Sequence, residues 1–137
     1  MTELKTKKKI LIIGITGGLA QITARLLLDR RNDIEVIGID ARDTEKCDQV
    51  EGLTCQTMKF SRGNFESLFR DHEFDTVFHL ARISSSNNSQ DNLKKRLALG
   101  VMGTSRILDL CQRFTVRKVV ILSTFHVYGA LADNSVF

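Results

Sequence analysis

Short apolar runs alternate with longer amphipathic segments along this chain of 137 residues. The apolar, β-branched runs predict five strands, at residues 10–13, 33–40, 53–60, 75–81 and 117–123. The segments between them have apolar residues at helical spacing and predict helices at residues 18–30, 64–70 and 91–113. Strands that alternate with helices indicate a parallel sheet joined by right-handed crossovers.

Each of the two longer predicted helices carries an apolar stripe that we expect to face the core. In the first helix the stripe is Leu19, Ile22, Thr23, Leu26 and Leu27. In the second helix it is Leu93, Leu97, Val101, Thr104, Leu108 and Cys111 or Gln112. The short helix is expected to begin at Asn64, because asparagine is a common N-cap.

The formal net charge of +4 comes from a lysine cluster near the N-terminus, Lys5, Lys7, Lys8 and Lys9. Removing these four from the 20 basic residues leaves 16, equal to the 16 acidic residues. We therefore expect residues 1–8 to be a basic flexible leader and residues 9–137 to be the domain. Such leaders can contact nucleic acid or acidic membranes, but a solvated terminus is commoner, and we expect neither partner.

Three cysteines, Cys47, Cys55 and Cys111, are an odd number without CxxC spacing. The three histidines are scattered, so neither a disulfide framework nor a zinc site is indicated, and we expect no bound metal. Reduced thiols are typical of cytoplasmic proteins, and we expect that location.

A glycine-rich turn, GITGGLA at residues 14–20, connects the first strand to the first helix. Gly14, Gly17 and Ala20 have the spacing of a dinucleotide-binding turn. The first glycine permits the tight turn, the second lets N–H groups approach a pyrophosphate, and the third small residue lets the helix pack closely on the sheet. A glycine trio alone also fits a corner without a ligand. The flanking strand and helix, and an acid after the next strand, favour phosphate binding.

That acid is Asp40, 20 residues beyond Ala20. At the end of the second strand of a dinucleotide-binding fold, a carboxylate accepts hydrogen bonds from the adenosine ribose. The same charge repels a 2′-phosphate, so we expect NAD rather than NADP as the cofactor. Arg42 tempers this expectation, because an arginine just past the strand can accommodate the 2′-phosphate.

Five motifs occur in the order and spacing of one family: GITGGLA, GID (38–40), FHLA (78–81), GT (103–104) and LSTFHVYG (122–129). On these motifs the chain resembles the N-terminal part of the extended short-chain dehydrogenases, the NAD-dependent epimerase/dehydratase group that acts on nucleotide sugars. The resemblance runs from about Lys9 to Gly129. It implies a three-layer Rossmann-like doubly wound parallel sheet, strand order 3-2-1-4-5, truncated at its C-terminus.

The resemblance also implies roles for individual residues. Thr124, with Ser123 beside it, takes the place of the active-site hydroxyl that hydrogen-bonds the substrate oxygen during hydride transfer. The positions that line the cofactor are Gly14, Thr16, Gly17, Gly18, Leu19, Ala20, Asp40, Ala41, Arg42, Ser61, Arg62, Leu80, Ala81 and Arg82.

Several positions depart from the family pattern. Arg82 replaces a second alanine after HLA, Ser61 stands where an aspartate normally contacts adenine, and Gly100 replaces an asparagine. Phe125 and His126 follow the threonine where the dehydratase branch has Asp-Glu, which argues against a 4,6-dehydratase.

The largest departure is the absence of the family's catalytic Tyr-x-x-x-Lys pair. The single tyrosine, Tyr128, belongs to VYG, and Ala132 lies four residues further on. We therefore expect the cofactor half of an epimerase/dehydratase-like enzyme, inactive as this fragment, whose open edge strand at 117–123 promotes homo-oligomers. The alternative is a non-catalytic dinucleotide-binding regulatory module. A methyltransferase fits less well, because FHLA and STFHVYG have no role there.

Overall fold

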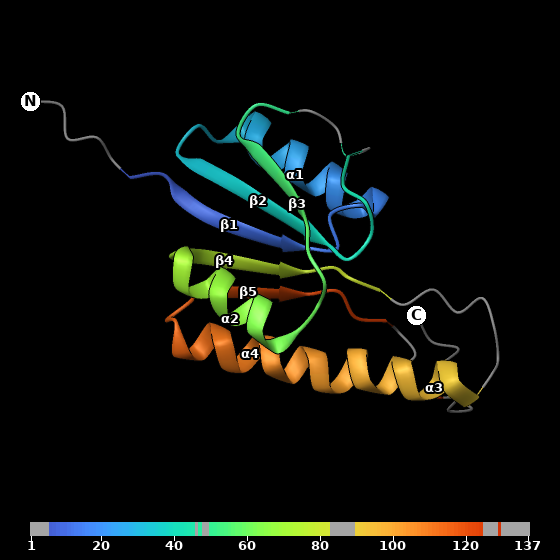
Figure 1. Ribbon diagram of the computed structural model, residues 1–137. Coiled ribbons are helices and arrows are strands. Elements are labelled where there is room, and N and C mark those ends of the chain that lie inside the picture. The colour runs from blue at the N-terminus through green and yellow to red at the C-terminus, as the bar shows by residue number, and fades with distance from the viewer. Residues whose placement is uncertain (1–5, 46, 48–49, 83–89, 125–128, 130–137) are drawn as a thin grey trace, which may run out of the picture.

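The computed structural model describes residues 6–45, 47, 50–82, 90–124 and 129. They form a five-stranded parallel sheet with the order β3-β2-β1-β4-β5, as expected (Figure 1). The strands are β1 (Lys8–Ile13), β2 (Ile34–Asp40), β3 (Leu53–Thr57), β4 (Phe74–His79) and β5 (Lys118–Ile121). Within the described part of the chain, no helix is long and apolar enough to cross a membrane.

The helices lie on both faces of this sheet, which makes three layers. Figure 1 shows α1 (Gly18–Arg30) on one face and α2 (Arg62–Asp71) on the other, beside the long helix that joins β4 to β5. The long helix has three parts, α3 (Gln90–Leu97), η1 (Ala98–Gly103) and α4 (Thr104–Arg113). The middle part is π-helical and contains two glycines, residues of low helix propensity.

The parallel register brings the carboxyl ends of the strands to one edge of the sheet. Ile13 pairs with Ile39 of β2 and with His79 of β4. Asp40 pairs with Thr57 of β3. The glycine turn, Asp40 and the end of β4 are therefore neighbours, although the sequence separates them widely.

The two faces of the sheet are filled by different kinds of side chain. Under α2 and α4 the core is bulky: Phe69 is 1% exposed, and its ring meets Phe74 edge-on at a centroid distance of 5.4 Å. We call this face the α2/α4 face. Under α1, the α1 face, aliphatic side chains of β1 and β2 meet the small residues Ala20, Ala24 and Cys47.

The helix at 18–30 is confirmed, but the prediction of its buried face is largely wrong, since of the expected stripe it is Leu27 that packs against the core cluster of the α1 face. Leu19, Ile22 and Leu26 are 55%, 58% and 49% exposed, whereas Ala20 and Ala24 are buried. The expected leucine-rich stripe and the buried alanine stripe, Ala20 and Ala24, both have helical spacing. The alanines are buried because α1 starts directly from the tight glycine turn, which holds its backbone close to the sheet and leaves no depth for leucine.

The buried face expected for the long helix is also largely wrong. Leu97, Val101 and Leu108 are exposed, and the side chains that α4 buries are Ile107, Leu110 and Cys111. Of the expected residues whose side chains are described, only Cys111 is in the core. The π-helical segment η1 has more residues per turn than an α-helix, so a stripe extrapolated with one period loses its phase there.

The start of α2 differs from the expectation as well. Ser61, not Asn64, is the N-cap, and its hydroxyl accepts a hydrogen bond from the Asn64 N–H at 3.3 Å. The Asn64 side chain instead donates to the Lys59 carbonyl at 2.8 Å. Both residue types cap helices, and the loop geometry after β3 decides between them.

Candidate functional site

The glycine turn is a close crossing between two backbone segments. Gly14 has φ +92°, a conformation that side chains other than glycine's disfavour, and its N–H donates to the Ile39 carbonyl at 2.8 Å. A Cβ on Gly14 would lie 2.7 Å from the Ala81 backbone. The turn therefore requires glycine at this position, and it lies directly against the residues that follow β4.

The N-terminus of α1 is open at this turn. Its N-cap is Gly17, in an extended conformation and without a side-chain cap, and the first helical turn contains no acidic residue. A Cβ on Gly18 would meet none of the described residues within 4 Å. The backbone N–H groups of the first turn can therefore donate to an anion, which the helix dipole also favours.

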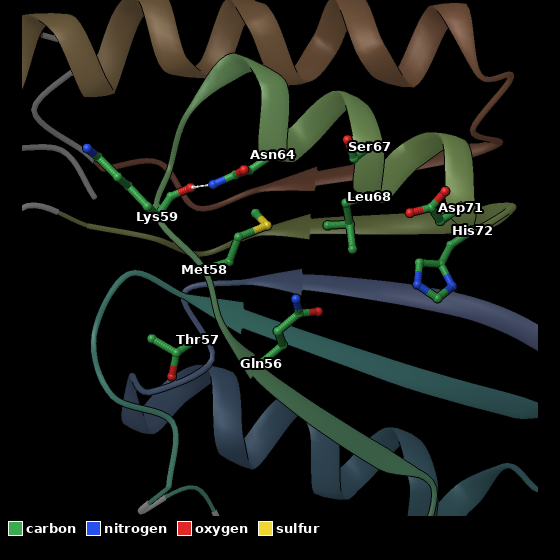
Figure 2. Close-up of a pocket in the computed structure, with 9 residues that line it drawn as sticks. All are labelled: Gln56, Thr57, Met58, Lys59, Asn64, Ser67, Leu68, Asp71 and His72. Carbon is green, nitrogen blue, oxygen red and sulfur yellow. Dashed lines mark hydrogen bonds between the residues drawn. The ribbon is translucent and has the colours of Figure 1, made fainter.

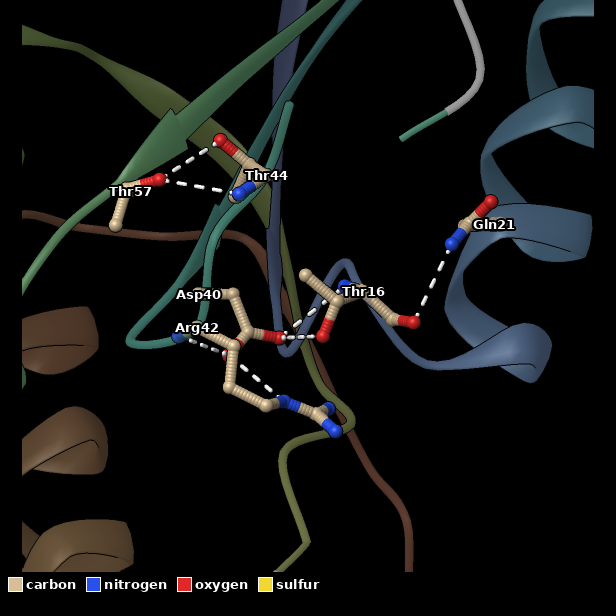
Figure 3. Close-up of polar contacts among 6 residues, drawn as sticks. All are labelled: Thr16, Gln21, Asp40, Arg42, Thr44 and Thr57. Carbon is tan, nitrogen blue, oxygen red and sulfur yellow. Dashed lines mark hydrogen bonds and ion pairs between the residues drawn. The ribbon is translucent and has the colours of Figure 1, made fainter. Parts of the chain in front are cut away.

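Asp40 is the polar centre of the site (Figure 3). Its Oδ2 accepts hydrogen bonds from the Thr16 N–H at 3.1 Å and the Thr16 hydroxyl at 2.7 Å. Its Oδ1 accepts one from the Arg42 N–H at 3.0 Å and contacts the Arg42 Nε at 3.5 Å. The carboxylate thus joins the glycine turn to the end of β2.

These contacts keep Asp40 ionised although it is buried. Burial acts to raise the pKa of the carboxyl, but the hydrogen bonds from Arg42 and Thr16 outweigh it and lower the pKa below the usual 3.8. The Asp40 side chain is 6% exposed, whereas that of Arg42 is 70% exposed. Arg42 is therefore the movable partner, and its displacement would open Oδ1 to a hydroxyl donor.

At the other end of the carboxyl edge of the sheet, β4 contacts the long helix and pairs with β5. The His79 Nε2 and the Thr104 hydroxyl are 3.2 Å apart, which links FHLA to GT, a contact that sequence reasoning did not foresee. Burial lowers the pKa of His79. The Leu122 N–H donates to the His79 carbonyl at 3.1 Å, and the exposed Ser123 and Thr124 follow.

The structure thus brings part of the expected site into contact. Gly14 meets Ala81, and Asp40 joins Thr16 to Arg42. The other expected residues lie at or beyond the ends of the neighbouring elements: Gly17, Gly18, Leu19, Ala20, Ala41, Ser61, Arg62, Leu80, Arg82, Ser123 and Thr124. Phe125, His126 and Tyr128 lie outside the described residues.

A separate hollow of about 380 Å³ lies between β3 and α2 (Figure 2). Its walls include Gln56, Lys59, Asn64, Asp71 and His72. None of the residues expected to bind the cofactor lines it. We therefore place the candidate site at the glycine turn, where a helix N-terminus and a buried carboxylate converge, and not in this hollow.

Comparisons with known proteins show the family of the chain. Residues 10–136 match the profile of the NAD dependent epimerase/dehydratase family. A dTDP-D-glucose 4,6-dehydratase of Dictyostelium discoideum is 29% identical over 93% of this chain, which spans 32% of that protein.

Two solved structures share the fold. The Bordetella bronchiseptica enzyme WbmH, in complex with NAD+, has a TM-score of 0.76 at 26% identity, over 90% of this chain and 41% of its own. The ADP-L-glycero-D-manno-heptose-6-epimerase of Helicobacter pylori has a TM-score of 0.79 at 19% identity, over 99% of this chain and 45% of its own.

Proposed function

The chain belongs to the NAD dependent epimerase/dehydratase family, and from this premise we propose that it is the NAD-binding part of an oxidoreductase that acts on nucleotide sugars. The observation that carries the proposal is the junction of Thr16, Asp40 and Arg42 beside the open N-terminus of α1. A phosphate site and a ribose site are adjacent there, at the switch point of a doubly wound sheet.

The pyrophosphate is expected on the backbone N–H groups of residues 17–20. Nothing described blocks Gly18, and small residues at Gly17 and Ala20 let a ligand and the sheet come close. The adenosine ribose is expected at Asp40. Ala81 and its neighbours Leu80 and Arg82 follow β4 beside the turn and line the path toward Ser123 and Thr124.

We favour NAD over NADP because of the charge arrangement at Asp40. The carboxylate is ionised and would repel a 2′-phosphate. Arg42, a cation that could offset this repulsion, already contacts the same carboxylate at 3.5 Å. An exposed arginine can turn away from it, so discrimination against NADP is expected to be incomplete.

NAD, when bound, takes up a hydride from a sugar carbon. Thr124 is proposed to hydrogen-bond the oxygen on that carbon and to position it, with Ser123 beside it. The sequence contains no Tyr-x-x-x-Lys pair to move the proton, so we expect the 137 residues alone to turn over no nucleotide sugar. Ile121 and Leu122, at the β5 edge, are 43% and 37% exposed, which favours association of copies through that edge.

A non-catalytic dinucleotide-binding regulator is the second candidate. Two observations favour it. Arg82, where the family has a small residue, is exposed at the end of β4, and the Ser61 hydroxyl is engaged in capping α2. The longer gene sequence would distinguish the two, because an enzyme requires Tyr-x-x-x-Lys within a few dozen residues of Phe137.

The direct test is calorimetric titration of the purified chain with NAD, NADP and S-adenosylmethionine. We expect NAD to bind, NADP to bind more weakly and S-adenosylmethionine not to bind. Gly17→Val should abolish NAD binding, because the side chain would cover the N–H groups at the start of α1. Gly63→Ala, at an open position of α2, is the matched control and should bind normally. Failure of all three ligands would refute the proposal.

A further inference from the structure

The segment that connects β2 to β3 covers the α1 face without forming a helix in its described residues. Its buried anchor is Cys47, which is 6% exposed and belongs to the core cluster of the α1 face. Cys55, on β3, packs against the same cluster. Two of the three cysteines of the chain therefore meet the same small region of the core.

The path of the connecting segment brings the two cysteines toward each other. The Thr44 N–H donates to the Thr57 hydroxyl at 3.1 Å, and the two hydroxyls are 3.0 Å apart (Figure 3). Cys55 lies two residues before Thr57, so both side chains project from the same face of β3. Cys47 lies three residues after Thr44. The Cys47 N–H donates to the Thr44 carbonyl at 3.0 Å, which keeps Cys47 close to Thr44 and to the core cluster that Cys55 packs against.

On β2, Cys55 is paired with a residue that has no side chain. Its partner on β2 is Gly38, whose missing Cβ makes room for the Ile15 side chain. The pKa of the Cys55 thiol is raised to about 12, first by burial and then by the neighbouring Cys47, which also hydrogen-bonds to it. Cys47 and Cys55 are therefore neighbours at the core cluster of the α1 face.

We propose that Cys47 and Cys55 form a modification site, a dithiol that peroxides oxidise to an intramolecular disulfide. The bond would fasten the segment that begins just after Asp40 and Arg42 to β3. Cys111 lies in the core cluster of the opposite face and has neither of these neighbours in it. The proposal does not depend on cofactor binding.

The reaction balances with a peroxide as the two-electron oxidant. One thiolate attacks a peroxide oxygen, which gives a sulfenic acid and, with hydrogen peroxide, one hydroxide that leaves as water. The second thiol then attacks the sulfenic sulfur, the S–S bond forms, and a second water leaves. The Cys55 thiol is largely protonated at neutral pH. We therefore expect oxidation to be slow at neutral pH and faster in mild alkali.

Peptide mapping after treatment with hydrogen peroxide tests the proposal. No lysine or arginine lies between Cys47 and Cys55, so trypsin leaves both in one peptide, which should lose two hydrogens. Cleavage after Glu51 then gives two peptides that should stay joined until a reductant is added. Oxidation should also raise the Tm by roughly 5–10 °C, because the bond closes a short loop.

Cys111→Ser is the matched control and should form the same joined peptides. Cys47→Ser and Cys55→Ser should each lose both the joined peptides and the Tm rise. The peptide map of the wild-type protein tests the proposal by itself, because it does not require any variant to fold. Separate sulfinic acids at Cys47 and Cys55, or disulfides only between chains, would overturn the proposal.

Discussion

The two faces of the sheet use opposite means to cover the same strands. On the α2/α4 face, Phe69 lies among aromatic neighbours, with ring centroids 5.4 Å from Phe74 and 6.0 Å from Phe114. On the α1 face, Ala20, Ala24 and Cys47 cover the strands. Large rings bury much apolar area, whereas small residues let backbone segments approach one another. The difference indicates that stability is concentrated on one face and ligand geometry on the other.

Phe69→Ala should produce the largest loss of stability. Removing a ring that is 1% exposed leaves a cavity, and the expected cost is about 3–5 kcal/mol in the free energy of unfolding. Urea unfolding measures this cost. Phe60→Ala, at a partly buried position beside Phe65, is the control and should cost less. If the folded Phe69→Ala protein lost NAD affinity selectively, the separation of roles between the faces would be wrong.

Gly38→Ala should affect both stability and the site. The new Cβ would lie 2.4 Å from the Ile15 Cγ1 and 2.8 Å from its Cβ, and Ile15 belongs to the glycine turn. We expect a cost of about 3 kcal/mol, at the upper end for overpacking, and a clear loss of NAD affinity by calorimetry. If Gly38→Ala lost the predicted stability but bound NAD like the wild type, the assignment of ligand geometry to the α1 face would be wrong.

Thr16→Val should have a smaller effect on stability, centred on Asp40. It removes the 2.7 Å hydroxyl bond but keeps the N–H bond, so we expect a cost of about 1.5 kcal/mol. The Asp40 pKa is lowered in the folded state, so its stabilisation is present above pH 3.8 and is lost as the pH falls through the folded pKa. Without the hydroxyl the folded pKa is less depressed, so the loss should be smaller and should end at a higher pH. Thr16→Ser should restore the wild-type acid profile, and an unchanged profile in Thr16→Val would contradict the role of the bond.

Replacing His79 should give the smallest effect, visible only in how the free energy of unfolding changes with pH. Its folded pKa lies below 6.5 because the ring is buried. The unfolded chain therefore binds the proton first, and stability falls as the pH drops from 6.5 toward the folded pKa, by no more than about 1.4 kcal/mol per pH unit. Stability curves for His79→Asn should lack this slope, and His72→Gln should keep it. A slope that survives in His79→Asn would assign it to another group.

The cofactor end of the site was largely readable in the sequence. A strand, three spaced small residues and an acid after the next strand predict the turn, the helix and the position of Asp40 at the end of β2. The close approach of Gly14 to Ala81 was not predicted, because the family resemblance named the two only as positions that line the cofactor. The Thr16 hydroxyl bond to Asp40 and the contact of His79 with Thr104 were not predicted, because each joins residues about 25 positions apart.

The sequence by itself determined the element types and the parallel sheet, because local spacing sets each period and alternating strands and helices require crossovers. Its family resemblance implied the strand order. Only the tertiary structure decided which stripe of α1 is buried, where the long helix becomes π-helical, and that Cys47 and Cys55 meet one core cluster. Helical spacing is satisfied by the leucine stripe and by the alanine stripe alike. The distance between helix and sheet selects one of them, and that distance is set by a turn whose geometry depends on residues from three strands.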